Sequence, residues 1–241
     1  GDFGASYYYD NMTVGELLSD RLPVTVMLAV ISLLMILICS VPLGLLCARG
    51  AGGVLDHAVN QILQTVMAVP SFFLGILLTY AFGLVLHWFQ PGQFVEPSES
   101  FFGAASYLVF PALAVALPKI AMVVKFLRNA VLSELSKDYV RTAKSRGNSS
   151  RRILYVHVLK NAMIPVITFT AMVVAEILAG SIIVEQVFSV PGVGRLLISS
   201  IFNRDYPVVQ AIVMYITLVV VAVNFLVDFM YQLLDPRVRT S

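Results

Sequence analysis

The chain has 241 residues, of which 59 % are hydrophobic and only 12 % are charged, and its formal net charge is +2. A soluble domain of this size normally carries about 25 % charged residues, so this composition excludes an ordinary soluble protein. It predicts a multi-span membrane protein instead. The two cysteines, Cys39 and Cys47, lie in one apolar run, which indicates neither a disulfide framework nor a zinc site.

Five apolar stretches follow one another along the chain, and each is long enough to cross the hydrocarbon core of a bilayer as a helix. The second is longer than one span needs and is interrupted at Pro70. We therefore expect a short interfacial helix there that leads into a kinked span. The predicted spans, within a single transmembrane domain of residues 1–241, are residues 22–46, 60–89, 106–127, 162–183 and 208–231.

A polar and strongly basic segment, residues 128–161, separates the third and fourth predicted spans. Its apolar side chains recur at helical spacing, which predicts one charged helix with an apolar stripe. The stripe consists of Leu132, Leu135, Tyr139 and Ala143.

Gly147 is expected to end this helix, because glycine enters the left-handed conformation without a clash of a Cβ atom. Asn148 or Ser149 is then expected to cap a second helix that runs into the fourth span. A helix–glycine–helix unit of this length is more than a simple turn between two spans. It predicts a surface that binds another protein.

The distribution of lysine and arginine predicts the orientation of the chain in the membrane. One set of segments between the spans holds eleven basic residues, including the basic segment and the C-terminal tail. The other set holds Arg21, Arg195 and Arg204. The basic segment and the C-terminus are therefore expected in the cytoplasm and Gly1 outside, which in turn implies a missing upstream span and six spans in total.

The sequence lacks the common motifs of catalysis. It contains no phosphate-binding loop of the form G-x-x-x-x-G-K-[ST] and no serine in a G-x-S-x-G turn. The histidines, His57, His87 and His157, are scattered without metal-binding spacing. Nucleic-acid binding is a poor explanation of the basic segment, because positive cytoplasmic loops are the default in membrane proteins. No catalytic, cofactor-binding or metal-binding residue is therefore expected.

Motifs spread along nearly the whole chain resemble those of one family, the B-type permease subunit of bacterial dipeptide, oligopeptide and nickel ATP-binding-cassette importers. The motifs are residues 1–4 (GDFG), 138–147 (DYVRTAKSRG), 161–165 (NAMIP), 184–195 (VEQVFSVPGVGR), 204–207 (RDYP) and 234–237 (LDPR). The resemblance implies an all-α bundle of the type I importer permease kind, located in the bacterial inner membrane.

Importers of this class carry a cytoplasmic loop of the form E-A-A-x-x-x-G, which the resemblance identifies as the helix that couples to the ATPase. Ala143 and Gly147 match its last alanine and its glycine, whereas Arg141 and Thr142 replace the Glu and the first alanine. The coupling residues implied are Asp138, Tyr139, Arg141, Thr142, Ala143 and Gly147.

The resemblance also implies the partners of the chain. These are a second homologous permease, two ATP-binding subunits that hold ATP and Mg²⁺, an external solute-binding protein and membrane lipid, with no nucleic acid. The chain itself would hydrolyse no ATP. Its cargo would be a peptide or a metal chelate such as that of nickel, carried along a path of which this chain forms half.

Two ionisable residues lie within predicted spans, Lys119 and Glu176. Such residues are costly in lipid and usually face a path or a partner, so both are candidates for the translocation path. Hydrogen bonding within the bundle is the alternative for Glu176, and contact with the partner permease or the inner interface is the alternative for Lys119. Counting about 1.5 Å of rise per residue gives a depth difference of about 10 Å, which predicts no direct pair between them.

The segment between the last two predicted spans is expected on the outer face. There it would form a gate or contact the solute-binding protein, through Glu185, Pro191, Gly192 and Arg195. A self-powered secondary transporter or channel is the alternative, but it predicts more intramembrane acids and internal repeats. An intramembrane enzyme would need a nucleophile–base or metal cluster, and none is visible.

Overall fold

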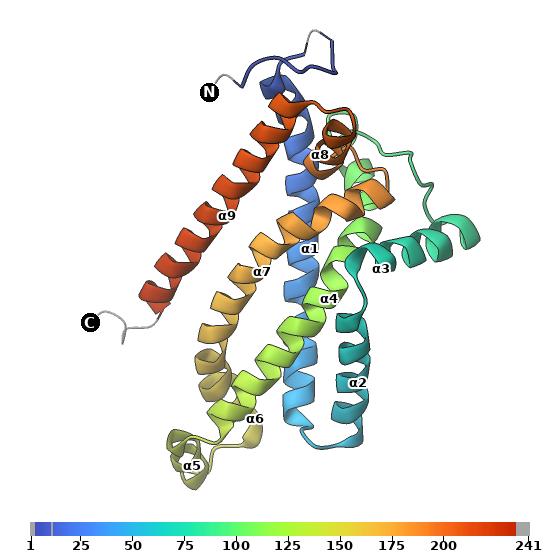
Figure 1. The fold of residues 1–241 in the computed structure, drawn as a ribbon. Coiled ribbons are helices and arrows are strands. Elements are labelled where there is room, and N and C mark those ends of the chain that lie inside the picture. The colour runs from blue at the N-terminus through green and yellow to red at the C-terminus, as the bar shows by residue number, and fades with distance from the viewer. Residues whose placement is uncertain (1–2, 11, 235–241) are drawn as a thin grey trace.

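The computed structural model describes residues 3–10 and 12–234, most of which are helical (Figure 1). The described residues form no β-strand, only an isolated antiparallel bridge between Ala5 and Thr13. The predicted all-α fold is confirmed. The helices are α1 (Val14–Arg49), α2 (Val54–Ala68), α3 (Ser71–Leu78), η1 (Thr79–Val85), α4 (Phe101–Leu135), α5 (Asp138–Ser145), α6 (Ser150–Arg152), η2 (Ile153–Val158), α7 (Leu159–Val187), α8 (Val193–Phe202) and α9 (Tyr206–Leu234), of which η1 and η2 are π-helical.

Helix α1 starts well before the predicted span of residues 22–46, because a capping box fixes its first turn. The backbone N–H of Glu16 donates to Thr13 Oγ1 (3.2 Å), and the N–H of Thr13 donates to Glu16 Oε2 (2.8 Å). At a rise of about 1.5 Å per residue, the 36 residues of α1 extend about 54 Å. A hydrocarbon core is about 30 Å thick, so α1 extends beyond it.

The second apolar stretch turns through 99° between α2 and the α3–η1 unit. Proline has no N–H to donate and disfavours a helical conformation in the residue before it. Accordingly, Val69 is extended, with φ −91° and ψ 124°. The predicted interruption at Pro70 is confirmed, but it is a right-angled turn rather than a kink. Helix α2 lies along α4, and α3 leads away from the bundle (Figure 1).

Four helical segments in the described part of the chain are long and apolar enough to cross a membrane, and the bent pair would be a fifth. Each of the five predicted spans overlaps one of these segments or the bent pair. The helix of the fourth predicted span, residues 162–183, begins earlier than expected, because α6, η2 and α7 form one continuous helical rod. The four segments are Val14–Arg49, Phe101–Leu135, Ser150–Ile177 and Tyr206–Val227.

Helix α4 forms the centre of the fold and packs against α1, α2, α3 and α7. Small residues let its neighbours approach closely, as is usual between membrane helices. A Cβ atom on Gly44 of α1 would lie 2.7 Å from Leu127 Cδ2, so a larger residue at that crossing would force the Leu127 side chain to move. The buried alanines of α4 are Ala104, Ala112, Ala114, Ala116 and Ala121.

The two ends of the bundle carry different segments (Figure 1). Helix α5 and the turn between α1 and α2 lie at one end, which we call the α5 end. The N-terminal segment and α8 lie at the opposite end, the α8 end. The predicted cytoplasmic C-terminal tail, residues 235–241, lies outside the described residues.

Candidate functional site

The helix–glycine–helix unit predicted from the sequence is present at the α5 end. Gly147 has a φ of +78°, and the N–H of Asn148 donates to the carbonyl of Ala143 (3.3 Å), which closes the end of α5. Ser149 caps the next helix, because its Oγ accepts from the N–H of Arg152 (3.4 Å). Both local predictions are confirmed.

The predicted apolar stripe, however, does not lie on a single helix. Helix α4 ends at Leu135, and α5 begins after Lys137, whose backbone is extended. The hydroxyl of Ser136 donates to the carbonyl of Ser133 (2.7 Å), a local bond that competes with helix propagation. The stripe is therefore divided between two helices that meet at this break.

Helix α5 turns its apolar side toward the protein and its polar side toward solvent. Val140 is buried, and Tyr139 and Ala143 pack half-buried against the hydrophobic core. The hydroxyl of Tyr139 also donates to Glu134 Oε2 (2.8 Å), which ties α5 to the end of α4. The exposed side consists of Asp138, Arg141, Thr142, Lys144, Ser145 and Arg146, and we call it the polar face of α5.

Lys119 and Glu176 form an ion pair between α4 and α7, so the prediction that they are too far apart was wrong. The estimate of depth assumed helices perpendicular to the membrane, whereas α7 is inclined to α1 (Figure 1). Each residue of an inclined helix rises less along the membrane normal, and both side chains are long. The Lys119 side chain is 21 % exposed and that of Glu176 52 %, which places the pair on the surface of this chain.

At the α8 end, the carboxylate of Glu185 joins three helices. The residue is fully buried near the end of α7. Its Oε1 accepts from the hydroxyl of Thr25 on α1 (2.9 Å). Its Oε2 accepts from the backbone N–H groups of Gly194 (2.8 Å) and Arg195 (3.1 Å) in the first turn of α8. A carboxylate suits this position, because the first N–H groups of a helix have no partners within the helix.

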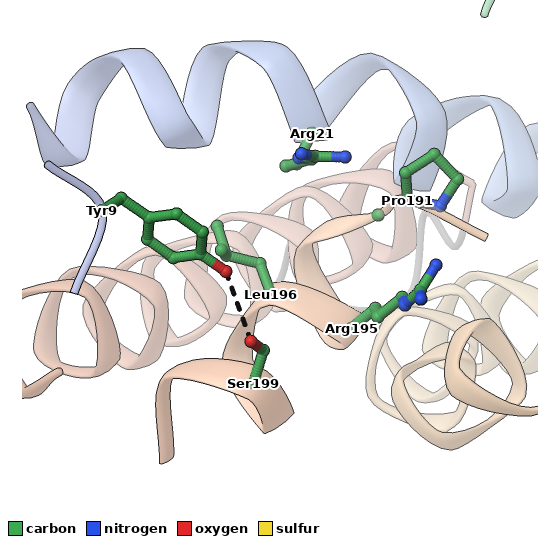
Figure 2. Close-up of a pocket in the computed structure, with 7 residues that line it drawn as sticks. Tyr9, Arg21, Pro191, Arg195, Leu196 and Ser199 are labelled. Carbon is green, nitrogen blue, oxygen red and sulfur yellow. Dashed lines mark hydrogen bonds between the residues drawn. The ribbon is translucent and has the colours of Figure 1, made fainter. Parts of the chain in front are cut away.

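Of the four residues predicted for an outer gate, Glu185 has no exposed surface in this conformation. Any part that it takes in a gate therefore acts through the residues that it holds in place. Pro191, Gly192 and Arg195 line a cavity of about 290 Å³ (Figure 2). Arg21 of α1 lines the same cavity.

A second buried carboxylate fastens the N-terminal segment to the α8 end. Asp205 lies between α8 and α9 and is fully buried. It accepts hydrogen bonds from the hydroxyl of Ser6 and from the N–H of Tyr7 (3.1 Å). The hydroxyls of Tyr9 and Ser199 form a further hydrogen bond (3.2 Å; Figure 2). Sequence reasoning noted Asp205 only as part of a motif and missed these contacts.

Sequence reasoning also missed a buried ion pair near the α5 end. Arg128 of α4 donates from Nε to Asp56 Oδ1 (2.7 Å) and from Nη2 to Asp56 Oδ2 (2.6 Å). The same carboxylate accepts from the N–H of Gly52 (2.9 Å) and from Asn60 Nδ2 (2.8 Å). The feature of the sequence that could have indicated this pair is Asp56, an acidic residue beside a long apolar stretch. The pair fixes the turn between α1 and α2 to α4.

Known proteins resemble this chain in sequence and in fold. The sequence profile of the binding-protein-dependent transport system inner membrane component family matches residues 40–240. The chain is 34 % identical to the oligopeptide transport system permease protein AppB of Bacillus subtilis, over 99 % of this chain and 76 % of that protein. Against the dipeptide transport system permease protein DppB of the same organism, identity is 33 % over 99 % and 75 % of the two chains.

A probable peptide ABC transporter permease protein, y4tP of Sinorhizobium fredii, is 35 % identical over 99 % of this chain and 76 % of its own length. Among solved structures, a chain of the methionine ABC transporter MetNI, in an inward-facing conformation, superposes with a TM-score of 0.72. That match covers 91 % of this chain and 97 % of the other at 16 % identity, so it supports the fold alone. The chain thus belongs to the family of binding-protein-dependent transport system inner membrane components, and it is a multi-pass permease subunit of an ABC importer.

Proposed function

We propose that this permease subunit forms half of a membrane path for peptides and that partner ATPases drive it through α5. Its relatives are named as oligopeptide and dipeptide transport permeases, which supports peptides as the cargo class. The observation that carries the coupling part is the orientation of α5. Its apolar side is held by the protein, which leaves the polar face of α5 free for a partner.

In this proposal the ATPase recognises charge and hydrogen-bonding groups rather than an apolar stripe. Arg141 and Asp138 are both strongly exposed and only 3.6 Å apart, so an exposed ion pair of this kind is easily exchanged for contacts with a partner. Thr142 lies beside them on the same face. ATP and Mg²⁺ bind to the partner subunits, and α5, with the C-terminal tail, faces the cytoplasm.

Gly147 and the π-helical segment η2 connect α5 to α7. Apolar side chains of α5 and η2 belong to the same hydrophobic core, so a movement of α5 is transmitted to the first turns of the α7 rod. π-Helical turns within α-helices are frequent at functional sites. In our proposal, closure of the ATPases moves α5, and the contact between α5 and η2 transmits this movement to the helices of the bundle.

The ion pair of Lys119 and Glu176 is proposed to face the translocation path or the second permease. Both residues lie within helices that are apolar enough to span the membrane, and Glu176 is half-exposed. Charged groups at this level are costly against lipid, so a polar neighbour is the favourable environment. A nickel chelate is the second candidate cargo, and a cationic complex would have to displace Lys119 from the half-exposed carboxylate of Glu176 in order to bind there.

Co-purification with the ATPase subunit tests the proposal. We expect Arg141→Glu, on the polar face of α5, to abolish co-purification of an ATP-hydrolysing subunit with the native transporter after detergent extraction. Arg204→Glu makes the same change of charge at the α8 end and should leave the complex intact. If the Arg141 variant retains its ATPase, the coupling part is wrong. If the native chain takes up cargo alone on an ion gradient, a self-powered transporter replaces the whole proposal.

A further inference from the structure

A basic cavity and a cavity of mixed, mainly acidic charge adjoin each other at the α8 end. The first, of about 290 Å³, contains the side chains of Arg21 from α1 and Arg195 from α8 (Figure 2). The second, of about 380 Å³, is lined by Asp20 and Glu96. Arg21 and Pro191 line both cavities, so the two spaces share a wall.

The charged groups of these cavities are not paired with one another. None of the ion pairs formed within the described part of the chain involves Arg21, Arg195, Asp20 or Glu96. Arg195 donates one hydrogen bond, from Nη1 to the carbonyl of Ser189 (2.8 Å), and its other donors remain available. Opposite charges are thus held close together in adjoining spaces without neutralising each other.

We propose that the two cavities form one binding site for a peptide with free termini, located at the α8 end of the permease. The C-terminal carboxylate of the peptide binds Arg21 and Arg195, since guanidinium groups match carboxylates with paired N–H donors. The N-terminal ammonium binds Asp20 and Glu96. This assignment rests on the proposed function, because it identifies where the cargo of the permease is first bound.

The size and the chemistry of the cavities both favour this ligand. Pockets for small molecules usually measure about 300–1,000 Å³, and two adjoining cavities of this size reach that range. The hydroxyls of Tyr9 and Ser199 also line the first cavity, and whichever of them accepts their mutual hydrogen bond adds a neutral donor beside the arginines. A simple anion would fill only the first cavity, and an acidic side chain of a partner protein would likewise leave the second one empty.

The test pairs each terminus of a peptide with the side chains expected to bind it. The probe is trialanine in four forms: unmodified, N-acetylated, C-amidated and blocked at both ends. Its dissociation constant is measured by saturation-transfer NMR on the native transporter complex in lipid nanodiscs. We expect each block to weaken binding about tenfold in the native protein, because it removes a charged hydrogen-bonding partner.

The variants should reduce these differences selectively. Arg21→Gln should lessen the loss caused by amidation and Glu96→Gln the loss caused by acetylation, because Arg195 and Asp20 remain to bind the same termini. Arg195→Gln removes the other guanidinium group expected to bind the C-terminal carboxylate of the peptide, and it should have the same effect as Arg21→Gln. Arg204→Gln, at an exposed arginine that lines neither cavity, is the matched control and should behave as the native protein.

Several results would overturn this site. They are the absence of binding, equal loss for all four peptides in every variant, or equal binding of a doubly blocked peptide that carries a glutamate side chain. The last result would assign the first cavity to an acidic side chain. ATP-driven uptake in proteoliposomes separates the two proposals. Uptake without selectivity for termini rejects only this site, whereas binding with selectivity but no ATP-driven uptake rejects the proposed function.

Discussion

The carboxylate of Glu185 occupies the space that any side chain at position 192 would need. A Cβ atom on Gly192 would lie 2.4 Å from Glu185 Oε2, well inside any van der Waals contact. A Cβ atom on Gly194 would lie 2.5 Å from the Cα atom of Ile182. The close approach of α8 to α7 therefore depends on two glycines and one buried acid.

Gly192→Ala should lower the midpoint of thermal unfolding by about 5 °C, because the new methyl group displaces the Glu185 carboxylate from a well-packed site. Intrinsic-fluorescence melting of the purified protein in detergent measures this shift. Gly15→Ala is the control, since its Cβ atom would meet nothing closer than Thr13 Oγ1 at 4.0 Å. Equal melting of both variants would contradict the packing described above.

Glu185 should also make stability depend on pH. It lies beyond the predicted span of residues 162–183, and burial raises the pKa of its carboxyl from 4.5 to about 7, against the opposing effect of hydrogen bonds from Thr25, Arg195 and Gly194. An acid whose pKa is higher in the folded state stabilises the fold at low pH and loses this effect as the pH rises through 7. The melting temperature of the native protein, relative to that of Glu185→Gln, should therefore rise as the pH is lowered from 8 to 6. A difference that does not change with pH would refute this.

Removing the buried aspartate near the α5 end should cost more stability than removing an exposed charge. Asp56→Ala leaves the Arg128 guanidinium, which is 20 % exposed, without its partner and should lower the melting temperature by roughly 5–10 °C. Lys137→Gln breaks the pair with Glu134, in which the lysine is 53 % exposed, and should change the melting temperature little. Similar shifts in the two variants would show that the Asp56 pair is not buried in solution.

Uptake should depend on the ion pair between α4 and α7. Glu176→Lys places two cations together at the level of the membrane span and should abolish uptake of a labelled peptide in proteoliposomes. The double variant with Lys119→Glu restores opposite charges and should recover part of the activity. Glu176→Gln should alter the rate or the cargo preference. If neither changes, Glu176 does not face the path.

Features that depend on local backbone chemistry could be predicted from the sequence. Gly147 ends α5, Ser149 begins α6 and Pro70 breaks the second apolar stretch, because each residue acts on its own turn. The start of α1 was equally local, since Thr13 and Glu16 have capping-box spacing. It was missed because the first span was estimated from hydropathy alone.

Contacts between distant segments could not be predicted in this way. Lys119 and Glu176 meet because of the inclination of a helix, and Asp56 meets Arg128 because α2 lies along α4. Neither relationship is encoded in the spacing of a single segment. For the same reason, the motif around Glu185 predicted an outer contact but not that its acid is buried.

The continuous helical rod that ends in α7 has a mechanical consequence. At about 1.5 Å per residue, the 29 residues of α7 alone extend about 43 Å. One end of the rod rests on α5 through apolar contacts, and the other is pinned by the Glu185 carboxylate to α1 and α8. No loop lies between these two attachments to absorb a displacement. In the proposed coupling, a displacement of α5 therefore reaches the contacts of Glu185 along one unbroken helix.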